Sequence, residues 1–65
     1  MKNNYIQETV DITCTDTQVT VTGTIVSENQ GRIRVDVGGV MMTFTRTAPS
    51  LYVSNMSGLE FTFKR

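Results

Sequence analysis

The chain has no histidine, no tryptophan and only one cysteine among its 65 residues. Without histidine it lacks the side chain that most often acts as a general base near neutral pH and as a metal ligand. A single cysteine cannot form an intrachain disulfide, and it cannot complete a zinc site of four cysteines or of two cysteines and two histidines. These absences argue against an enzyme and against a bound cofactor or metal. They leave packing and backbone hydrogen bonds to hold the fold.

Long apolar runs are also missing, since no segment approaches the roughly 18–20 apolar residues of a membrane span. We therefore expect no membrane association. A lone cysteine is typical of a reducing compartment, so the expected location is the cytoplasm. The net charge is zero, from six basic and six acidic residues, and this balance argues against a general polyanion binder. The length fits one domain over residues 1–65.

Alanine and leucine are scarce, with one and two copies, whereas threonine, valine, isoleucine, phenylalanine and tyrosine make up 28 of the 65 residues. Side chains branched at Cβ lose rotamer freedom in a helix and fit well on a pleated sheet. The composition therefore predicts an all-β protein.

Alternation of apolar and polar residues predicts five strands, at 7–14, 18–27, 32–37, 40–46 and 59–64. Gly38-Gly39 suits a tight type I′ hairpin turn, because both residues accept positive φ. Gly23 falls on the same apolar strand face as Val19 and Val21, where it marks a bulge, a bend or a close backbone approach. The segment 47–58 breaks the alternation and contains Pro49, which predicts a short 3₁₀ turn or an irregular crossover.

Five antiparallel strands in so short a chain are best accommodated by a small barrel, of the SH3-like or OB-like kind, because closure protects the strand edges. The alternative is an open, curled antiparallel sheet that dimerises to cover its second face.

The first candidate binding group is a pair of arginines. Arg32 and Arg34 project from the same face of one strand, about 7 Å apart. Arg46 would lie beside them if the register of the hairpin places it on the same face. Two guanidinium groups on one face can clamp a phosphate or a carboxylate. The alternative is a solvated strand face on which Asp36 neutralises the arginines.

Adjacent methionines give a second candidate. Because neighbouring residues in a strand point to opposite faces, a buried Met42 places Met41 outside. Met41 would then form an exposed apolar patch together with Leu51, Val53 and Met56, and such patches mark protein interfaces. The alternative is that the segment 47–58 folds these side chains over the end of the barrel.

Aromatic residues available for stacking are few. Phe44, Phe61 and Phe63 fall on strand faces predicted to be core, so Tyr52, together with Tyr5, remains. Cys14 lies in register with Val10 and Ile12, and we expect a buried, unreactive thiol.

Charge is divided unevenly along the chain. Residues 1–30 carry one basic and four acidic side chains, and residues 31–65 carry five basic and two acidic ones. Such an asymmetry can steer a partner or orient self-association, unless the two halves interleave in space.

Two functions follow from these candidates. The first is a non-enzymatic module that binds a protein partner, or itself, through the outer face of 32–37 and 40–46 and the segment 47–58. Its residues would be Arg32, Arg34, Met41, Tyr52 and Met56. Small single barrels of this kind are frequent in phage and mobile-element genomes, which is the context we expect. The second function is a nucleic-acid-binding barrel that uses Arg32, Arg34, Arg46 and Tyr52.

Overall fold

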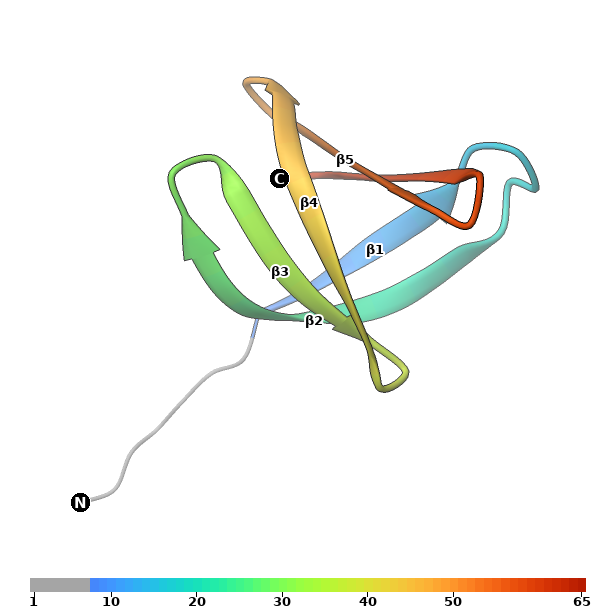
Figure 1. The fold of residues 1–65 in the computed structure, drawn as a ribbon, viewed down its shortest axis with the longest axis horizontal. Coiled ribbons are helices and arrows are strands. Elements are labelled where there is room, and N and C mark those ends of the chain that lie inside the picture. Colours follow the sequence, from blue (N-terminus) through green and yellow to red (C-terminus); the bar gives the residue numbers. More distant parts are fainter. Residues whose placement is uncertain (1–7) are drawn as a thin grey trace.

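The computed structural model describes residues 8–65, which form six antiparallel strands (Figure 1). The strands are β1 (Thr9–Cys14), β2 (Thr20–Asn29), β3 (Arg32–Val37), β4 (Val40–Ala48), β5 (Leu51–Met56) and β6 (Leu59–Lys64). Each strand pairs with the next one along the chain, and β6 pairs with β1 to close a barrel. The prediction of an all-β, closed antiparallel barrel is confirmed.

The strand count of five is wrong, because the segment 47–58 contains a strand. β5 pairs with β4 on one side and with β6 on the other, in a register that sets Tyr52 opposite Phe63. Pro49 and Ser50 form the turn before it, so the proline lies outside the ladder. Alternation fails as a signal here because apolar side chains occupy both faces of β5 and a serine, Ser54, is buried. The sequential strand order also differs from the Greek-key order of an OB fold.

Tight turns connect most of the strands. Three two-residue loops, Gln30–Gly31, Gly38–Gly39 and Ser57–Gly58, have positive φ at both positions. This is the geometry of type I′ turns, whose twist matches that of the flanking strands. The turn predicted at Gly38–Gly39 is therefore confirmed, with φ values of 60° and 91°.

Inward-facing side chains fill the barrel; every strand except β2 contributes a buried one, and β2 contributes the partly buried Ile25. The buried apolar residues are Val10, Ile12, Cys14, Ile33, Val35, Met42, Phe44, Tyr52 and Phe63. Phe63 is the centre of an aromatic group: it meets Phe44 edge to face at 4.8 Å and stacks on Tyr52 at 5.1 Å between ring centroids. Burial of these rings removes a large apolar area from water and so contributes to the stability of the barrel.

Gly23 takes the place of an inward side chain on β2. A Cβ atom at this position would lie 2.5 Å from Cγ1 of Val35 and 2.8 Å from Cδ1 of Ile12. Of the three roles expected for Gly23, the structure shows the close approach. The bulge lies further along β2, at Val26, where the register with β3 shifts.

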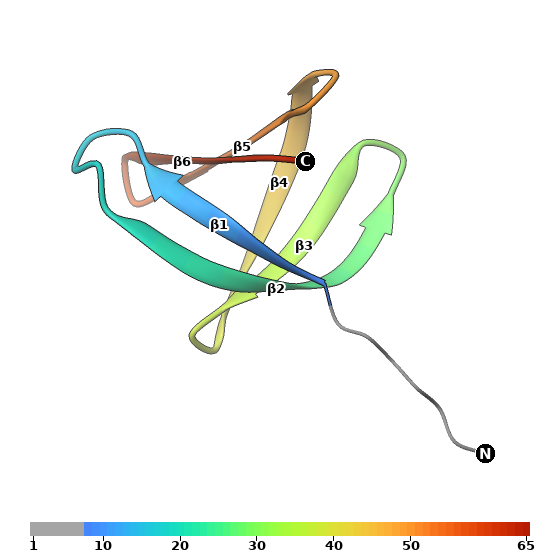
Figure 2. The ribbon, with the colours of Figure 1, turned by 180° about the vertical axis from the view of Figure 1, so that it is seen from behind.

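The closing seam between β1 and β6 is short. Only two residue pairs join the strands, Thr13 with Thr62 and Cys14 with Phe61. Beyond them β1 and β6 diverge, as the rear view shows (Figure 2). A hollow of about 510 Å³ opens between the two strands, above the buried Val10.

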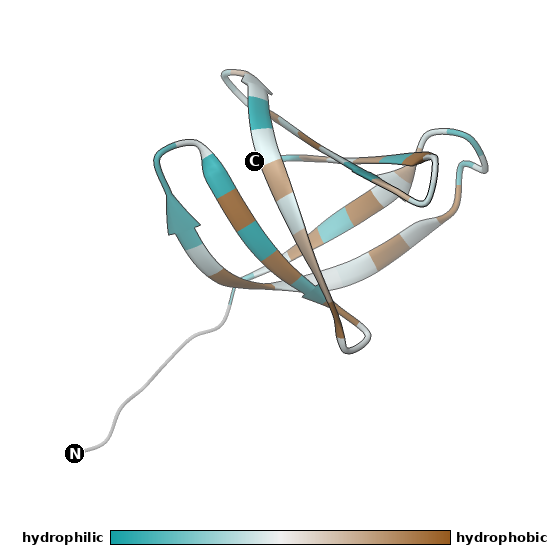
Figure 3. Ribbon diagram, viewed as in Figure 1, coloured by the Kyte–Doolittle hydropathy of each residue, from teal (hydrophilic) through white to brown (hydrophobic). Residues whose placement is uncertain are grey.

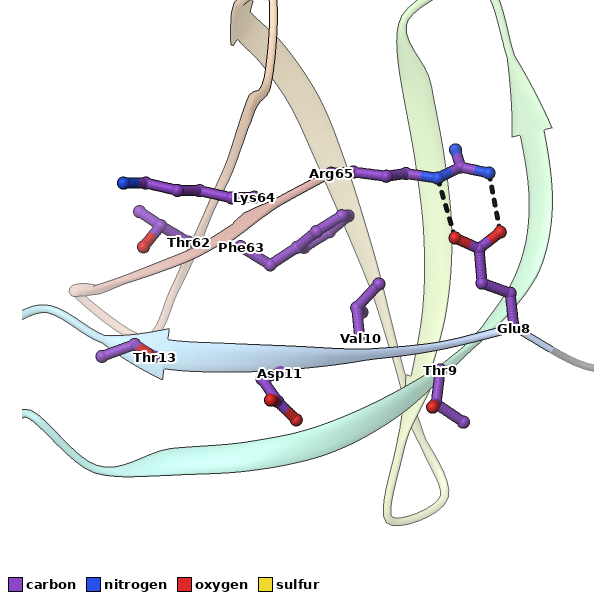
Figure 4. Close-up of a pocket in the computed structure, with 9 residues that line it drawn as sticks. All are labelled: Glu8, Thr9, Val10, Asp11, Thr13, Thr62, Phe63, Lys64 and Arg65. Atoms are coloured by element: carbon purple, nitrogen blue, oxygen red, sulfur yellow. Dashed lines mark hydrogen bonds and ion pairs between the residues drawn. The ribbon is translucent and has the colours of Figure 1, made fainter.

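Arg65 bridges the wide end of this hollow (Figure 4). Its guanidinium donates to both carboxylate oxygens of Glu8, at 2.8 and 3.1 Å, and lies 2.8 Å from Oε2 of Glu28 on β2. These ion pairs raise the pKa of Arg65 above its ordinary value. Side chains therefore join the strands where the backbone ladder has ended.

Candidate functional site

The arginine pair lies where the sequence predicts it. Arg32 and Arg34 point outward from β3 and are exposed, whereas Ile33 and Val35 between and beyond them are fully buried. The two side chains therefore project from one face of one strand. Their Cα atoms are about 7 Å apart, the spacing of residues i and i+2 in a strand.

Strand register surrounds the arginines with small polar side chains. Arg34 lies between Ser27 on β2 and Thr43 on β4, and Arg32 lies next to Asn29 on β2. These five residues, together with Glu28, line a groove of about 600 Å³, which we call the β2–β4 groove. Sequence analysis missed the three polar neighbours, because only the register of the hairpins brings them beside the arginines.

The arginines have no acidic partner among residues 8–65. The ion pairs of this part of the chain are those of Arg65 with Glu8 and with Glu28. Asp36, expected as a neutralising partner, instead accepts a hydrogen bond from the backbone N–H of Gly39 at 2.8 Å. The carboxylate thus stabilises the hairpin turn and leaves both guanidinium groups available to an outside anion.

Arg46 does not belong to this groove. It pairs with Tyr52, whose side chain points into the barrel, whereas its neighbour Thr45 pairs with Arg32 on the outer face. Arg46 is exposed because β4 reaches the end of the barrel there. The register therefore places it on the opposite side of the sheet from Arg32 and Arg34.

Tyr52 is not available as a binding residue, and the expectation of an exposed ring is wrong. Only 6% of the residue is exposed, and the ring stacks on Phe63. Its burial follows from the β5 strand that the sequence pattern concealed. Tyr5, its suggested companion, lies outside the described residues.

The two adjacent methionines behave as predicted, with Met42 buried and Met41 exposed. The apolar patch built on Met41 does not assemble, however. Met41 lies near the start of β4, whereas Leu51 pairs with Ala48 at the other end of that strand. Met56 packs against the core, so it does not join Met41 on the outer face.

Cys14 is buried, as expected. A hydrogen bond from the side chain of Thr17 is the main factor that lowers the pKa of its thiol. Within residues 8–65 no group of three His, Cys, Asp or Glu side chains is placed to hold a metal ion. The same part of the chain has no helix long and apolar enough to cross a membrane.

Charge separates along the barrel axis. Asp16, Asp36 and Glu60 lie at the end formed by the turns 15–19, 38–39 and 57–58, which we call the acidic end. The turns 30–31 and 49–50 form the opposite, basic end, together with Arg65. Its charged side chains are Arg32, Arg46, Lys64 and Arg65, with Glu8 and Glu28. This separation does not follow the two halves of the chain: Asp36 and Glu60 of the acidic end come from the basic half, and Glu8 and Glu28 of the basic end come from the acidic half.

The chain matches no family model, no curated protein and no solved structure. Its function is therefore inferred from the geometry and charge of the β2–β4 groove.

Proposed function

We propose that the protein is a non-enzymatic binding module that recognises an acidic segment of a protein partner through the β2–β4 groove. The observation that carries this proposal is the pair Arg32 and Arg34, which share one face without a carboxylate partner among residues 8–65. Guanidinium groups bind carboxylates through paired hydrogen bonds, and these are stronger than bonds between neutral groups.

The neighbours of the arginines suit the same ligand. The hydroxyl groups of Ser27 and Thr43 and the amide of Asn29 can bond the backbone of an extended segment lying along the groove. Met41 adds an exposed apolar side chain further along the outer face of β4. A segment with acidic residues flanking an apolar one would use all of these groups.

A nucleic acid is the alternative ligand, since phosphates also bind arginine pairs. Single-stranded nucleic acids, however, gain much of their affinity by stacking bases on exposed aromatic rings. Among residues 8–65, Tyr52, Phe44 and Phe63 are buried and Phe61 packs against the core. The protein segment therefore fits the groove better.

Fluorescence anisotropy with a labelled glutamate-rich peptide and a labelled oligonucleotide tests the proposal. We expect the peptide to bind, and Arg34→Ala to weaken binding about tenfold, because a hydrogen bond to a charged group contributes about 1.5–3 kcal/mol. Arg46→Ala is the matched control and should leave the affinity unchanged. Peptide binding that is insensitive to Arg34→Ala would overturn the proposal. Tighter oligonucleotide binding, with a salt dependence that Arg34→Ala reduces, would establish the nucleic-acid alternative.

A further inference from the structure

Apolar side chains surround the opening of the barrel at its acidic end. Sequence alternation places Val19 and Val21 on one face, with Val19 directly before β2 and Val21 within it. The register shows that Val21 faces inward, since it lies opposite the fully buried Ile12. Both residues are nevertheless exposed, Val19 by 57% and Val21 by 41%. β3 ends at Val37, level with Gly23, so no strand covers this part of β2.

Two hairpins contribute the rest of this surface. Val40, at the start of β4, is 50% exposed, and Leu59, at the start of β6, is 36% exposed. Both continue inward-facing rows, since Val40 pairs with Val37 and Leu59 pairs with Met56. We call the four exposed residues Val19, Val21, Val40 and Leu59 the apolar mouth. Figure 3 shows the brown, hydrophobic stretches on the first half of β2 and at the start of β4.

Only acidic groups flank the mouth among the described charged residues. Asp16 lies in the turn before Val19, Asp36 next to the hairpin that carries Val40, and Glu60 next to Leu59. Glu60 accepts a hydrogen bond from the hydroxyl of Thr15 at 2.9 Å, which ties the first turn to β6. A ligand for this surface must therefore combine apolar side chains with positive charge.

The opposite end of the same barrel has that chemistry. The turn between β4 and β5 projects there, with Ala48 and Pro49 exposed and Leu51 half-buried. Lys64 lies opposite Leu51 in the ladder, and Arg46 lies two positions before Ala48. We call Ala48, Pro49 and Leu51 the basic-end knob. Neither Lys64 nor Arg46 forms an ion pair with another residue of 8–65.

We propose that the protein associates head to tail, with the basic-end knob of one copy seated in the apolar mouth of the next. Opposite charges meet around an apolar contact in this arrangement, as complementary interfaces require. A heterologous contact of this kind builds a ring or a filament. The mouth is small compared with the roughly 800 Å² per partner of a standard stable interface, so association is weak and depends on concentration.

The test is sedimentation of the full chain over a series of protein and salt concentrations. We expect the average mass to rise with protein concentration and to fall as salt is added, since salt screens the charges. Val40→Lys should disable the mouth, and Ala48→Glu should disable the knob. Each should weaken self-association about tenfold or more, by placing like charge against like charge. Val26→Lys is the matched control, because Val26 is a similarly exposed valine at the bulge of β2.

Mixing the two disabled variants separates this proposal from symmetric dimerisation. Each variant keeps one intact surface, so the mixture should associate although neither variant does alone. A chain that is monomeric at every concentration would overturn the proposal. So would normal self-association of Ala48→Glu, which would indicate contact between two mouths. Circular dichroism confirms that each variant is folded. The outcome is independent of the β2–β4 groove, because neither variant alters it.

Discussion

At the scale of single residues, inward or outward position was predicted best where a strand has one apolar face. In β3 the alternation of Ile33 and Val35 with Arg32 and Arg34 gave the correct sides, and therefore the correct binding candidates. Tyr52 was misplaced because its strand carries apolar residues on both faces. Arg46 was grouped with Arg32 and Arg34, although alternation from the buried Met42 and Phe44 already places it on the inner side of β4, opposite Tyr52.

The barrel requires glycine at position 23, because there is no room for a side chain there. We expect Gly23→Ala to lower the free energy of unfolding by about 1–3 kcal/mol, because its Cβ would overlap the side chains of Val35 and Ile12. Chemical denaturation measures the loss. In a Val35→Ala background the same substitution should cost less, since the nearest methyl group is gone. Equal costs in the two backgrounds would show that crowding is not the cause.

At the scale of elements, hairpins with two apolar strands and glycine turns were easy to predict, whereas β5 was not. The turn at Ser57–Gly58 has the same geometry as Gly38–Gly39, but it follows a strand that shows no alternation. The short turn at Pro49 was interpreted as a crossover for the same reason. The sequence therefore contains the residues of both turns that flank β5. The strand between them was not predicted because its residues do not alternate between apolar and polar.

At the turn between β5 and β6, the cost of left-handed backbone can be measured separately from steric conflict. Gly58 has φ of +77° and no atom within 4 Å of the position a Cβ would take, so a side chain there meets no steric conflict. We expect Gly58→Ala to destabilise the fold by about 1–2 kcal/mol, the cost of left-handed backbone for an L-residue. Thermal or chemical unfolding provides the value. Gly58→Asn should cost less, because asparagine tolerates this conformation, and a larger loss for asparagine would contradict the explanation.

At the scale of the whole molecule, the barrel depends on one seam. Arg65→Met keeps much of the side-chain volume and removes the ion pairs with Glu8 and Glu28. We expect a loss of about 1 kcal/mol, because the pairs are partly exposed and solvent screens them. Lys64→Met is the matched control, since Lys64 forms no ion pair within residues 8–65. Equal losses for the two variants, measured by urea unfolding, would mean that the bridge contributes nothing specific.

Composition and alternation were sufficient to predict a closed barrel, but they did not show how charge is arranged around it. The two oppositely charged halves of the sequence do not become the two ends of the barrel, because the turns alternate between the ends and bring residues of both halves to each. Residues 15–19, 38–39 and 57–58 meet at one end even though they come from all parts of the chain. Arg32 and Arg34 come from the second half, but Asp36, in the same strand, lies at the acidic end.

The two-pair seam also bears on the order in which the chain folds. Five of the six strand pairings join neighbours along the sequence, so each can form across a short loop. The pairing of Thr13 with Thr62 instead brings together segments separated by most of the chain. Its formation carries the largest loss of loop entropy and is repaid by two ladder pairs, the hydrogen bonds between Thr15 and Glu60, and a salt bridge. We therefore expect a meander of hairpins to form early and the cylinder to close late.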